Sequence, residues 1–453
     1  MDTYTYRQAA DQAWKRITNL TDYGQYTVYE QMYINGFWHQ ANALLTCLDY
    51  LLNTNQQDNL LPNQQDKSIV KNAIQWVFVK HLFNISYKDK LWPVDPTNPN
   101  WPLYPWDPSH EIDFSQLTPI WTDAGLSGSG PWLDDFGWWG LALQKAYENA
   151  DALGYDQSFS KLLLPMADAC WEALHGTWDS KNGGACNSQG RDKYGQPIHL
   201  TGKNCVTNET LWLLSQRLHT SAPDQSKYVD QNRLSQQWFL DAYQKGNLLS
   251  KDNLVLERPK DIPNGMPYPP DWTWVGDQGL FILACLGSQG AGGDDLLQLA
   301  NQIGAAVESQ LTDSDTVIHD HNVSILVKDY TPDYATGKGV YLRCWSSWYS
   351  GDPNENFLAN ATAVWKTCKA GPFPKDPDPN TKQFQFCFNW NPKGRPYDPK
   401  DPTNPSSGED DDDYLFYDEK NFASLQFCLL ILEVAGMAAL NVGVKIAPDK
   451  PIS

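Results

Sequence analysis

Apolar residues recur at helical spacing along almost the whole 453-residue chain, and this periodicity restricts the fold more than any other feature. Strand-like alternation is scarce and short, as in 317–327. Twelve segments have the helical pattern: 3–19, 34–53, 66–85, 133–153, 157–175, 204–219, 225–244, 275–287, 293–311, 338–350, 355–369 and 420–440. The sequence therefore predicts an all-α protein.

These segments differ in how much of their circumference is apolar. Segments 275–287 and 420–440 are apolar on nearly every side, whereas 3–19 and 293–311 have a single apolar stripe. A helix that is apolar all round must be surrounded by protein, and a striped helix covers something. We therefore expect the even-numbered segments to form an inner layer and the odd-numbered segments an outer layer.

Connection lengths alternate in the same order. The connections from even to odd segments are short, and those from odd to even segments are long: 86–132, 176–203, 245–274, 312–337 and 370–419. In a ring of antiparallel helical hairpins all the long loops lie at one end, where binding and catalysis concentrate. The pattern predicts an (α/α)6 barrel, a toroid of six helical hairpins, formed by a single domain over 1–453 with long loops on the active-site face.

Composition excludes several classes of partner. The chain has 54 acidic and 34 basic residues, a net charge of −20, which argues against nucleic acid or an anionic membrane as partners. No apolar run is long enough to span a bilayer. The nine cysteines include no Cys-x-x-Cys pair, and the acidic run 409–413 is typical of a solvated loop. We expect no metal, no cofactor and a monomer.

Two features concern the location of the protein. The first sixteen residues have no apolar core of the kind a signal peptide needs. Five Asn-x-Ser/Thr sequons are present; they begin at Asn19, Asn84, Asn208, Asn322 and Asn360. The sequons fit an extracellular protein whose leader has been removed.

One acidic doublet stands out at the start of a predicted inner helix. Asp134 and Asp135 lie between Trp132 and the pair Trp138-Trp139, at the end where the long loops are expected. Helix capping explains one such carboxylate, but two in succession among tryptophans favour a function. Neighbouring side chains in a first turn hold their carboxyl groups roughly 5–6 Å apart, close to the separation used by retaining glycosidases. One acid would stay protonated while the other remains anionic.

The sequence around this doublet resembles the Asp-Asp-x-x-Trp-Trp motif of glycoside hydrolase family 76, the endo-α-1,6-mannanases. Three further stretches resemble family segments in the expected order: Gly183-Gly184 with Lys203-Asn204-Cys-Val-Thr-Asn208-Glu209, Trp272-Thr-Trp274-Val-Gly-Asp277-Gln278-Gly279, and Gly339-Val-Tyr341-Leu-Arg343. The resemblance implies an (α/α)6 barrel and a retaining mechanism, with α-mannan as substrate.

Carried onto this chain, the resemblance implies Asp134 as nucleophile and Asp135 as general acid/base. Expected substrate contacts are Trp132, Trp138, Asn208, Glu209, Trp274, Asp277, Gln278, Tyr341 and Arg343. His39 joins this set because it begins a predicted inner helix at the same end. For Asn208 and Glu209 helix capping is the alternative, for Arg343 pairing with a buried carboxylate, and for His39 a structural role.

The loop 86–132 contains Trp92, Trp101, Trp106 and Trp121, which either build sugar subsites or pin the loop to the barrel.

Two other functions stay open. A mannan transglycosylase would use the same two acids with a sugar hydroxyl as acceptor, and an inactive carbohydrate-binding protein would use the cleft alone. An epimerase on this fold would need histidine bases, and only His39 among eight histidines is well placed.

Overall fold

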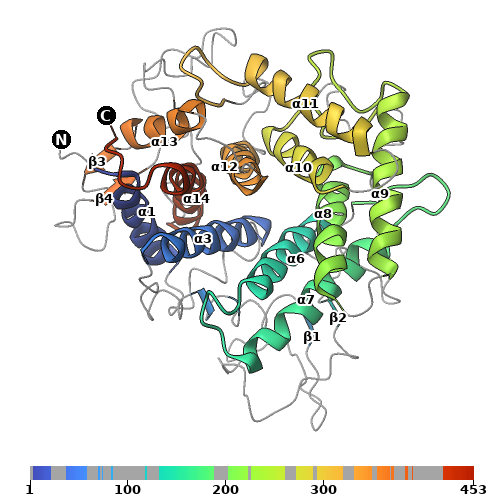
Figure 1. The fold of residues 1–453 in the computed structure, drawn as a ribbon, viewed down its shortest axis with the longest axis horizontal. Helices are drawn as coiled ribbons and strands as arrows, with labels where there is room; N and C mark the ends of the chain where they lie inside the picture. Colours follow the sequence, from blue (N-terminus) through green and yellow to red (C-terminus); the bar gives the residue numbers. More distant parts are fainter. Residues whose placement is uncertain are drawn as a thin grey trace. The chain divides into compact units, whose positions relative to one another are not determined.

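A computed structural model describes the following residues: 4–21, 37–58, 70–71, 74, 83–84, 118–119, 132–187, 202–222, 226–260, 272–288, 293–319, 331–348, 355–367, 369–371, 383–385, 390 and 422–452. Over these residues the structure is mainly helical (Figure 1). Eleven helices are described: α1 (Tyr6–Thr21), α3 (Phe37–Asp58), α6 (Leu133–Glu148), α7 (Gln157–His175), α8 (Cys205–Ser221), α9 (Ser226–Gln244), α10 (Val275–Leu286), α11 (Gly293–Gln310), α12 (Thr331–Trp348), α13 (Glu355–Thr367) and α14 (Phe422–Ile446).

Four short strands accompany them: β1 (Phe83–Asn84) pairs antiparallel with β2 (Thr118–Pro119), and β3 (Lys369–Gly371) with β4 (Gln383–Gln385). The expected helix over 66–85 is wrong at its end, because residues 83 and 84 form β1. Residues 70, 71 and 74 are helical, and the rest of that segment lies outside the described residues. The four tryptophans of loop 86–132 also lie outside them.

The described residues group into two compact units, one over Tyr33–Trp238 with 263–266, and one over 1–32, 239–262 and 267–453; the boundary falls within α9. The expected single domain over 1–453 stays a prediction.

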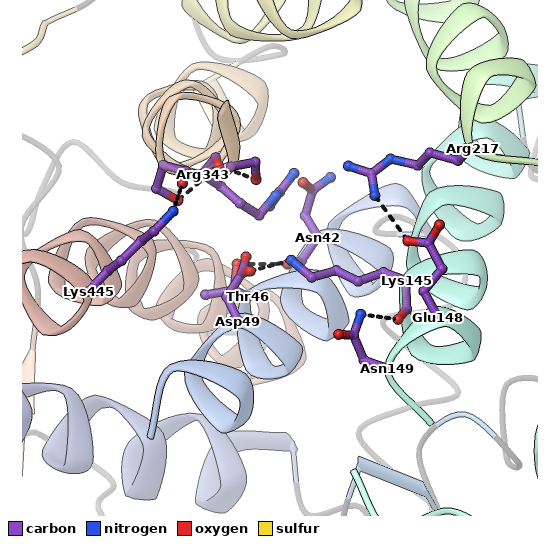
Figure 2. A network of polar contacts seen from close by, with 11 residues as sticks. Asn42, Thr46, Asp49, Lys145, Glu148, Asn149, Arg217, Arg343 and Lys445 are labelled. Atoms are coloured by element: carbon purple, nitrogen blue, oxygen red, sulfur yellow. Dashed lines mark hydrogen bonds and ion pairs between the residues drawn. The ribbon is translucent and has the colours of Figure 1, made fainter. Parts of the chain in front are cut away.

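In the first unit the helices α3, α6 and α8 run parallel. The Trp38 and Trp138 rings stack at 5.8 Å near the two helix starts, and Lys145 pairs with Asp49 farther along the same two helices (Figure 2). Between α6 and α8 the order is also parallel, because Gly137 lies against Thr210 and Gly140 against Leu214.

The inner position of α6 and the outer position of α7 follow from which of their residues are buried. Twelve of the sixteen residues of α6 are buried, so protein surrounds this helix. By contrast, α7 buries one stripe that includes Phe159, Leu163, Met166 and Cys170, and the short connection after α6 returns it along the outside. The expected division into inner and outer helices is therefore confirmed for these two helices.

In the second unit α10, α12 and α14 run parallel to one another. Trp274 lies against Gly337 and Gly279 against Tyr341, which fixes the order of α10 and α12. Gly339 lies against Ala435, and the Lys445 ammonium donates to the carbonyl of Ser346, which fixes α12 and α14 (Figure 2). Thus the described inner helices of each unit begin at one end of that unit.

Three outer helices are each followed in the chain by a similar small hairpin. The hairpins are Thr177–Cys186 after α7, Leu248–Leu256 after α9 and Leu311–His319 after α11, named here the α7, α9 and α11 hairpins. In each hairpin, two bonds from a backbone N–H to a backbone carbonyl join the arms. In the α7 hairpin, Asp179 donates to Gly184 and Cys186 to Thr177. The corresponding donors and acceptors are Ser250 to Leu254 and Leu256 to Leu248 in the α9 hairpin, and Asp313 to Val317 and His319 to Leu311 in the α11 hairpin. The strand-like alternation expected over 317–327 begins within the α11 hairpin, and residues 320–327 lie outside the described residues.

Six cysteines whose side chains the structure describes are free thiols: Cys47, Cys170, Cys186, Cys205, Cys285 and Cys344. Cys186 is half-buried and the other five are buried, as unpaired cysteines usually are. Among the described helices, none is both long and apolar enough to cross a membrane.

Candidate active site

The acidic doublet lies in the first turn of α6, at its second and third residues. Asp134 is half-buried, whereas Asp135 is only 4% exposed. The Oδ2 atom of Asp135 accepts a hydrogen bond from the backbone N–H of Trp132 at 2.6 Å. Trp132 precedes the helix in extended conformation (φ −78°, ψ 163°), so this bond caps the helix start and fixes one oxygen of Asp135.

A comparison within the chain shows what is special about this doublet. Asp294 and Asp295 occupy the same two positions in the first turn of α11. Both are exposed, and they begin an outer helix with a single buried stripe. An acidic doublet at a helix start is therefore not by itself a site, and burial distinguishes Asp134-Asp135.

The parallel order of α3, α6 and α8 brings several expected residues to one end of their unit. His39 is the third residue of α3, Asp134 and Asp135 begin α6, and Asn208 and Glu209 lie in the first turns of α8. His39 and Asp134 therefore lie at the same end of this unit.

Aromatic rings join α3 and α6 just inside that end. Trp138 is 1% exposed and its ring stacks on Trp38, with 25° between the planes. The Trp38 ring also lies 3.8 Å from the His39 ring, and both ring nitrogens of His39 are buried. This packing gives Trp138 a role in holding the two helix starts together, and it leaves Trp132, which is half-buried, as the more accessible tryptophan.

Asn208 is fully buried and its amide bonds within the chain. Its Oδ1 accepts from the N–H of Ala185 at 2.7 Å, and its Nδ2 donates to the carbonyls of Ala185 (3.0 Å) and Asn204 (2.9 Å). Asn204 in turn is the cap of α8, accepting from the N–H of Thr207. These bonds support the structural alternative for Asn208. Glu209 is also fully buried, with both carboxylate oxygens inaccessible.

The loop held by Asn208 is further braced by an ion pair. Lys203 donates to Asp179 Oδ2 at 2.7 Å and to the carbonyl of Gly183. The hydrogen bond from Lys203 is the main cause that holds the pKa of the Asp179 carboxyl well below its usual value. Gly183 and Gly184 have positive φ and lie against the Trp238 ring, which explains the glycine pair of the sequence motif.

The remaining expected residues, Trp274, Asp277, Gln278, Tyr341 and Arg343, lie in the other unit. Gln278 repeats the contacts of Asn208: it accepts from the N–H of Val255 (2.8 Å) and donates to the carbonyls of Val255 (3.0 Å) and Trp274 (2.9 Å). Asp277 is fully buried, at the helix position that Asp135 has in α6.

Trp274, Tyr341 and Arg343 are buried in the α10–α12 contact or close to it. A Cβ atom on Gly276 or Gly337 would meet the Trp274 ring at 2.3 and 2.5 Å, so the indole packs between two glycines. Tyr341 is 4% exposed, and burial raises the pKa of its phenol well above its usual value. Arg343 is 7% exposed.

Two features of this site were missed by the sequence analysis. Gly137 packs so closely on Thr210 that an added Cβ would lie 2.2 Å from the hydroxyl oxygen, which sets the spacing between the first turns of α6 and α8. The carboxylate of Asp179, in the α7 hairpin, accepts four hydrogen bonds: three from Lys181 and Asn182 in the same hairpin and one from Lys203. The Gly-x-x-Gly spacing of 137 and 140 was the available signal for the first feature. Among the described residues, no group of three or more His, Cys, Asp or Glu side chains could hold a metal ion.

Comparison with known proteins gives similarity in structure only, since the sequence matches no family profile and no curated protein. The Lin0763 protein from Listeria innocua is 16% identical, covers 98% of both chains and has a TM-score of 0.57. The GH76A α-1,6-mannanase from Salegentibacter sp. HEL1_6 is 15% identical over 95% of this chain and 98% of that chain (TM-score 0.54).

A third similar structure is Dfg5 from Chaetomium thermophilum in complex with glucosamine, 13% identical over 96% of this chain and 90% of that chain (TM-score 0.57). An inactive variant of the Salegentibacter mannanase, in which two consecutive aspartates are replaced by asparagine, is solved with α-1,6-mannotriose. The chain has the fold of the glycoside hydrolase family 76 structures, which are (α/α)6 barrels, so the predicted fold class is confirmed.

Proposed function

We propose that this chain is a retaining glycoside hydrolase that cleaves the interior of α-1,6-linked mannan. The observation that carries the proposal is the buried acidic doublet Asp134-Asp135 in the first turn of the inner helix α6. Its support is the fold, which is shared with α-1,6-mannanases, one of which is inactive when two consecutive aspartates are replaced.

In the proposed mechanism Asp134 is the nucleophile. Its carboxylate attacks the anomeric carbon and forms a covalent glycosyl ester, while Asp135 gives its proton to the leaving glycosidic oxygen. In the second step Asp135, now a base, takes a proton from water, and the water oxygen displaces Asp134 from the anomeric carbon. Two displacements return the product to the configuration of the substrate.

The first turn of α6 suits these two roles. The helix start stabilises negative charge, which favours the anionic nucleophile at Asp134. Since Oδ2 of Asp135 already accepts the N–H of Trp132, the transferable proton belongs on Oδ1. The capping bond also limits rotation of the Asp135 side chain, and a fixed acid is what proton transfer to a bound sugar needs.

The experiment that tests the proposal is digestion of linear α-1,6-mannan with product analysis. Mass spectrometry should show oligosaccharides of mixed length, and ¹H NMR of the first products should show the α anomer at the new reducing end. A β anomer would overturn the double displacement. Release of single mannose units alone would overturn the endo action.

The same digestion separates the alternatives. A transglycosylase would give products longer than the starting oligosaccharide when α-1,6-mannotetraose is supplied as acceptor, with little free reducing sugar. A carbohydrate-binding protein would bind mannotriose without any turnover. Either result would replace the hydrolase proposal.

A single catalytic domain, a monomeric state and an extracellular location also stay proposals. The sequon argument for the location is weaker than the sequence suggested, because two of the five asparagines are not available as glycan acceptors. Asn208 is fully buried and Asn360 is 3% exposed, and both amides bond to the backbone of hairpins.

A further inference from the structure

Each of the α7, α9 and α11 hairpins has one backbone N–H in its second arm that finds no acceptor within the hairpin. Each has two cross-arm bonds, and the residue between the bonded positions of the second arm has its N–H directed away from the first arm. These residues are Ala185, Val255 and Ile318. Because a buried backbone N–H without an acceptor is costly, each position needs an acceptor from elsewhere.

A side-chain carboxamide supplies that acceptor in all three hairpins. Asn208 accepts from Ala185, Gln278 from Val255 and Asn360 from Ile318, at 2.7–2.8 Å. The amide nitrogens of Asn208 and Gln278 also donate to the carbonyl of the same hairpin residue. A carboxamide thus pairs with both backbone groups of one residue, as a neighbouring strand would.

Asn208 and Gln278 agree in further detail. Each is the fourth residue of its inner helix, lies 23 positions after its hairpin partner, and donates a second bond to the carbonyl of the residue that precedes the helix, Asn204 or Trp274. Both side chains are fully buried. Each therefore ties a hairpin on one of the long odd-to-even connections to the start of the next inner helix.

We propose that Asn208 and Gln278 are positioning residues, each of which holds the hairpin before its own inner helix in register, and that they do not contact the sugar. This inference rests on the proposed glycosidase function for its effect on turnover, although the loop-holding itself does not. The carboxamide pairs act on loops, so their loss should weaken substrate binding more than it slows the chemical step at Asp134 and Asp135.

The direct test is hydrogen exchange of the two hairpins, measured by mass spectrometry on peptides covering 178–187 and 249–257. Asn208→Ala should raise exchange of the first peptide about tenfold or more, as loss of buried hydrogen bonds predicts, and leave the second unchanged. Gln278→Ala should do the reverse. Each variant thus controls for the other, because global destabilisation would raise exchange in both peptides together.

Two isosteric variants separate the bonds from the space they fill. Asn208→Asp and Gln278→Glu keep the acceptor oxygen but lose the donors, and they place an anionic oxygen against two carbonyls. Both should raise exchange of their own hairpin, whereas Gln298→Glu, an exposed amide on α11, should not. Unchanged exchange in the hairpin of either alanine variant would overturn the proposal.

Kinetics on α-1,6-mannan supply the second readout. Both alanine variants should raise KM several-fold with kcat within about twofold of the wild type. A fall in kcat with unchanged KM would mean that these side chains act at the reacting atoms, and would overturn the positioning role. If the wild type lacks turnover the proposed hydrolase function fails, but the exchange result still decides whether the carboxamides hold the loops.

Discussion

The Oδ2 atom of Asp135 accepts the backbone N–H of Trp132 at 2.6 Å, so the Asp135 side chain caps the start of α6. The same side chain is the proposed acid/base. These two roles make different demands on the side chain. Capping needs only an acceptor oxygen, whereas acid/base catalysis needs a group that gains and loses a proton.

Substitutions of Asp135 should therefore separate stability from turnover. Asp135→Asn keeps an acceptor oxygen, so its melting temperature should stay close to that of the wild type while mannan cleavage is lost. Asp135→Ala loses both, and should cost about 0.5–2 kcal/mol of unfolding free energy. The measurement is thermal or urea unfolding beside a reducing-sugar assay. Equal destabilisation by both variants would contradict the capping role.

Gly137→Ala should disturb the candidate site through packing. The new methyl group would lie 2.2 Å from the Thr210 hydroxyl oxygen, so α6 and α8 must separate, at a cost of about 1–3 kcal/mol. The matched control is Gly304→Ala in α11, where nothing lies within 4 Å of the added Cβ. That variant should gain roughly 0.5–1 kcal/mol from helix propensity. Destabilisation of both variants alike would refute the packing argument.

The ion pair between Lys145 and Asp49 joins α3 to α6 beyond the aromatic contact (Figure 2). Their side chains are only 15% and 16% exposed. Lys145→Met should cost about 2–4 kcal/mol, because it leaves a largely buried carboxylate without its cation. The double variant Lys145→Met with Asp49→Leu should recover much of that loss in chemical unfolding. No recovery would show that the two side chains stabilise the helices independently.

Acid should weaken the α7 hairpin through Asp179. Lys203 lowers the pKa of this carboxyl, so its contribution to stability is fully present above the unfolded-state pKa of about 4 and is lost as the pH falls through the lower folded-state value. Lys203→Met should therefore flatten the fall in stability below about pH 4. Unfolding curves between pH 2.5 and 6 measure this, with the exposed Lys181→Met as control. An unchanged pH profile in Lys203→Met would remove Lys203 as the cause.

The sequence predicted the fold well because periodicity and loop length both report on burial. An all-round apolar helix such as α10 can only lie inside, and a striped helix such as α11 can only cover it. The same reasoning failed over 66–85, where an apolar helical pattern continued into Phe83 and Asn84, which pair with β2 instead. Strand pairing depends on partners 36 and 34 residues away (83 with 119, and 84 with 118), which local periodicity does not report.

The candidate site was predicted less completely, for a physical reason. Residue type at a helix start indicates that a polar side chain is needed there, but not what it bonds to. Asn208 and Gln278 were therefore expected to touch substrate, whereas their amides bond to hairpin backbone. Their shared position in the helix and shared distance from the hairpin become visible only when the hairpins themselves are seen.

The most direct measurement for the central claim compares two acidic doublets that occupy the same helical positions. Asp134→Asn and Asp135→Asn should each lower kcat on α-1,6-mannan by a factor of a thousand or more while Kd for mannotriose stays within a few-fold of the wild type. Asp294→Asn and Asp295→Asn, at the start of α11, should leave both quantities unchanged. Turnover that survives in the α6 variants, or falls equally in the α11 variants, would contradict the assignment of Asp134 and Asp135 as the catalytic pair.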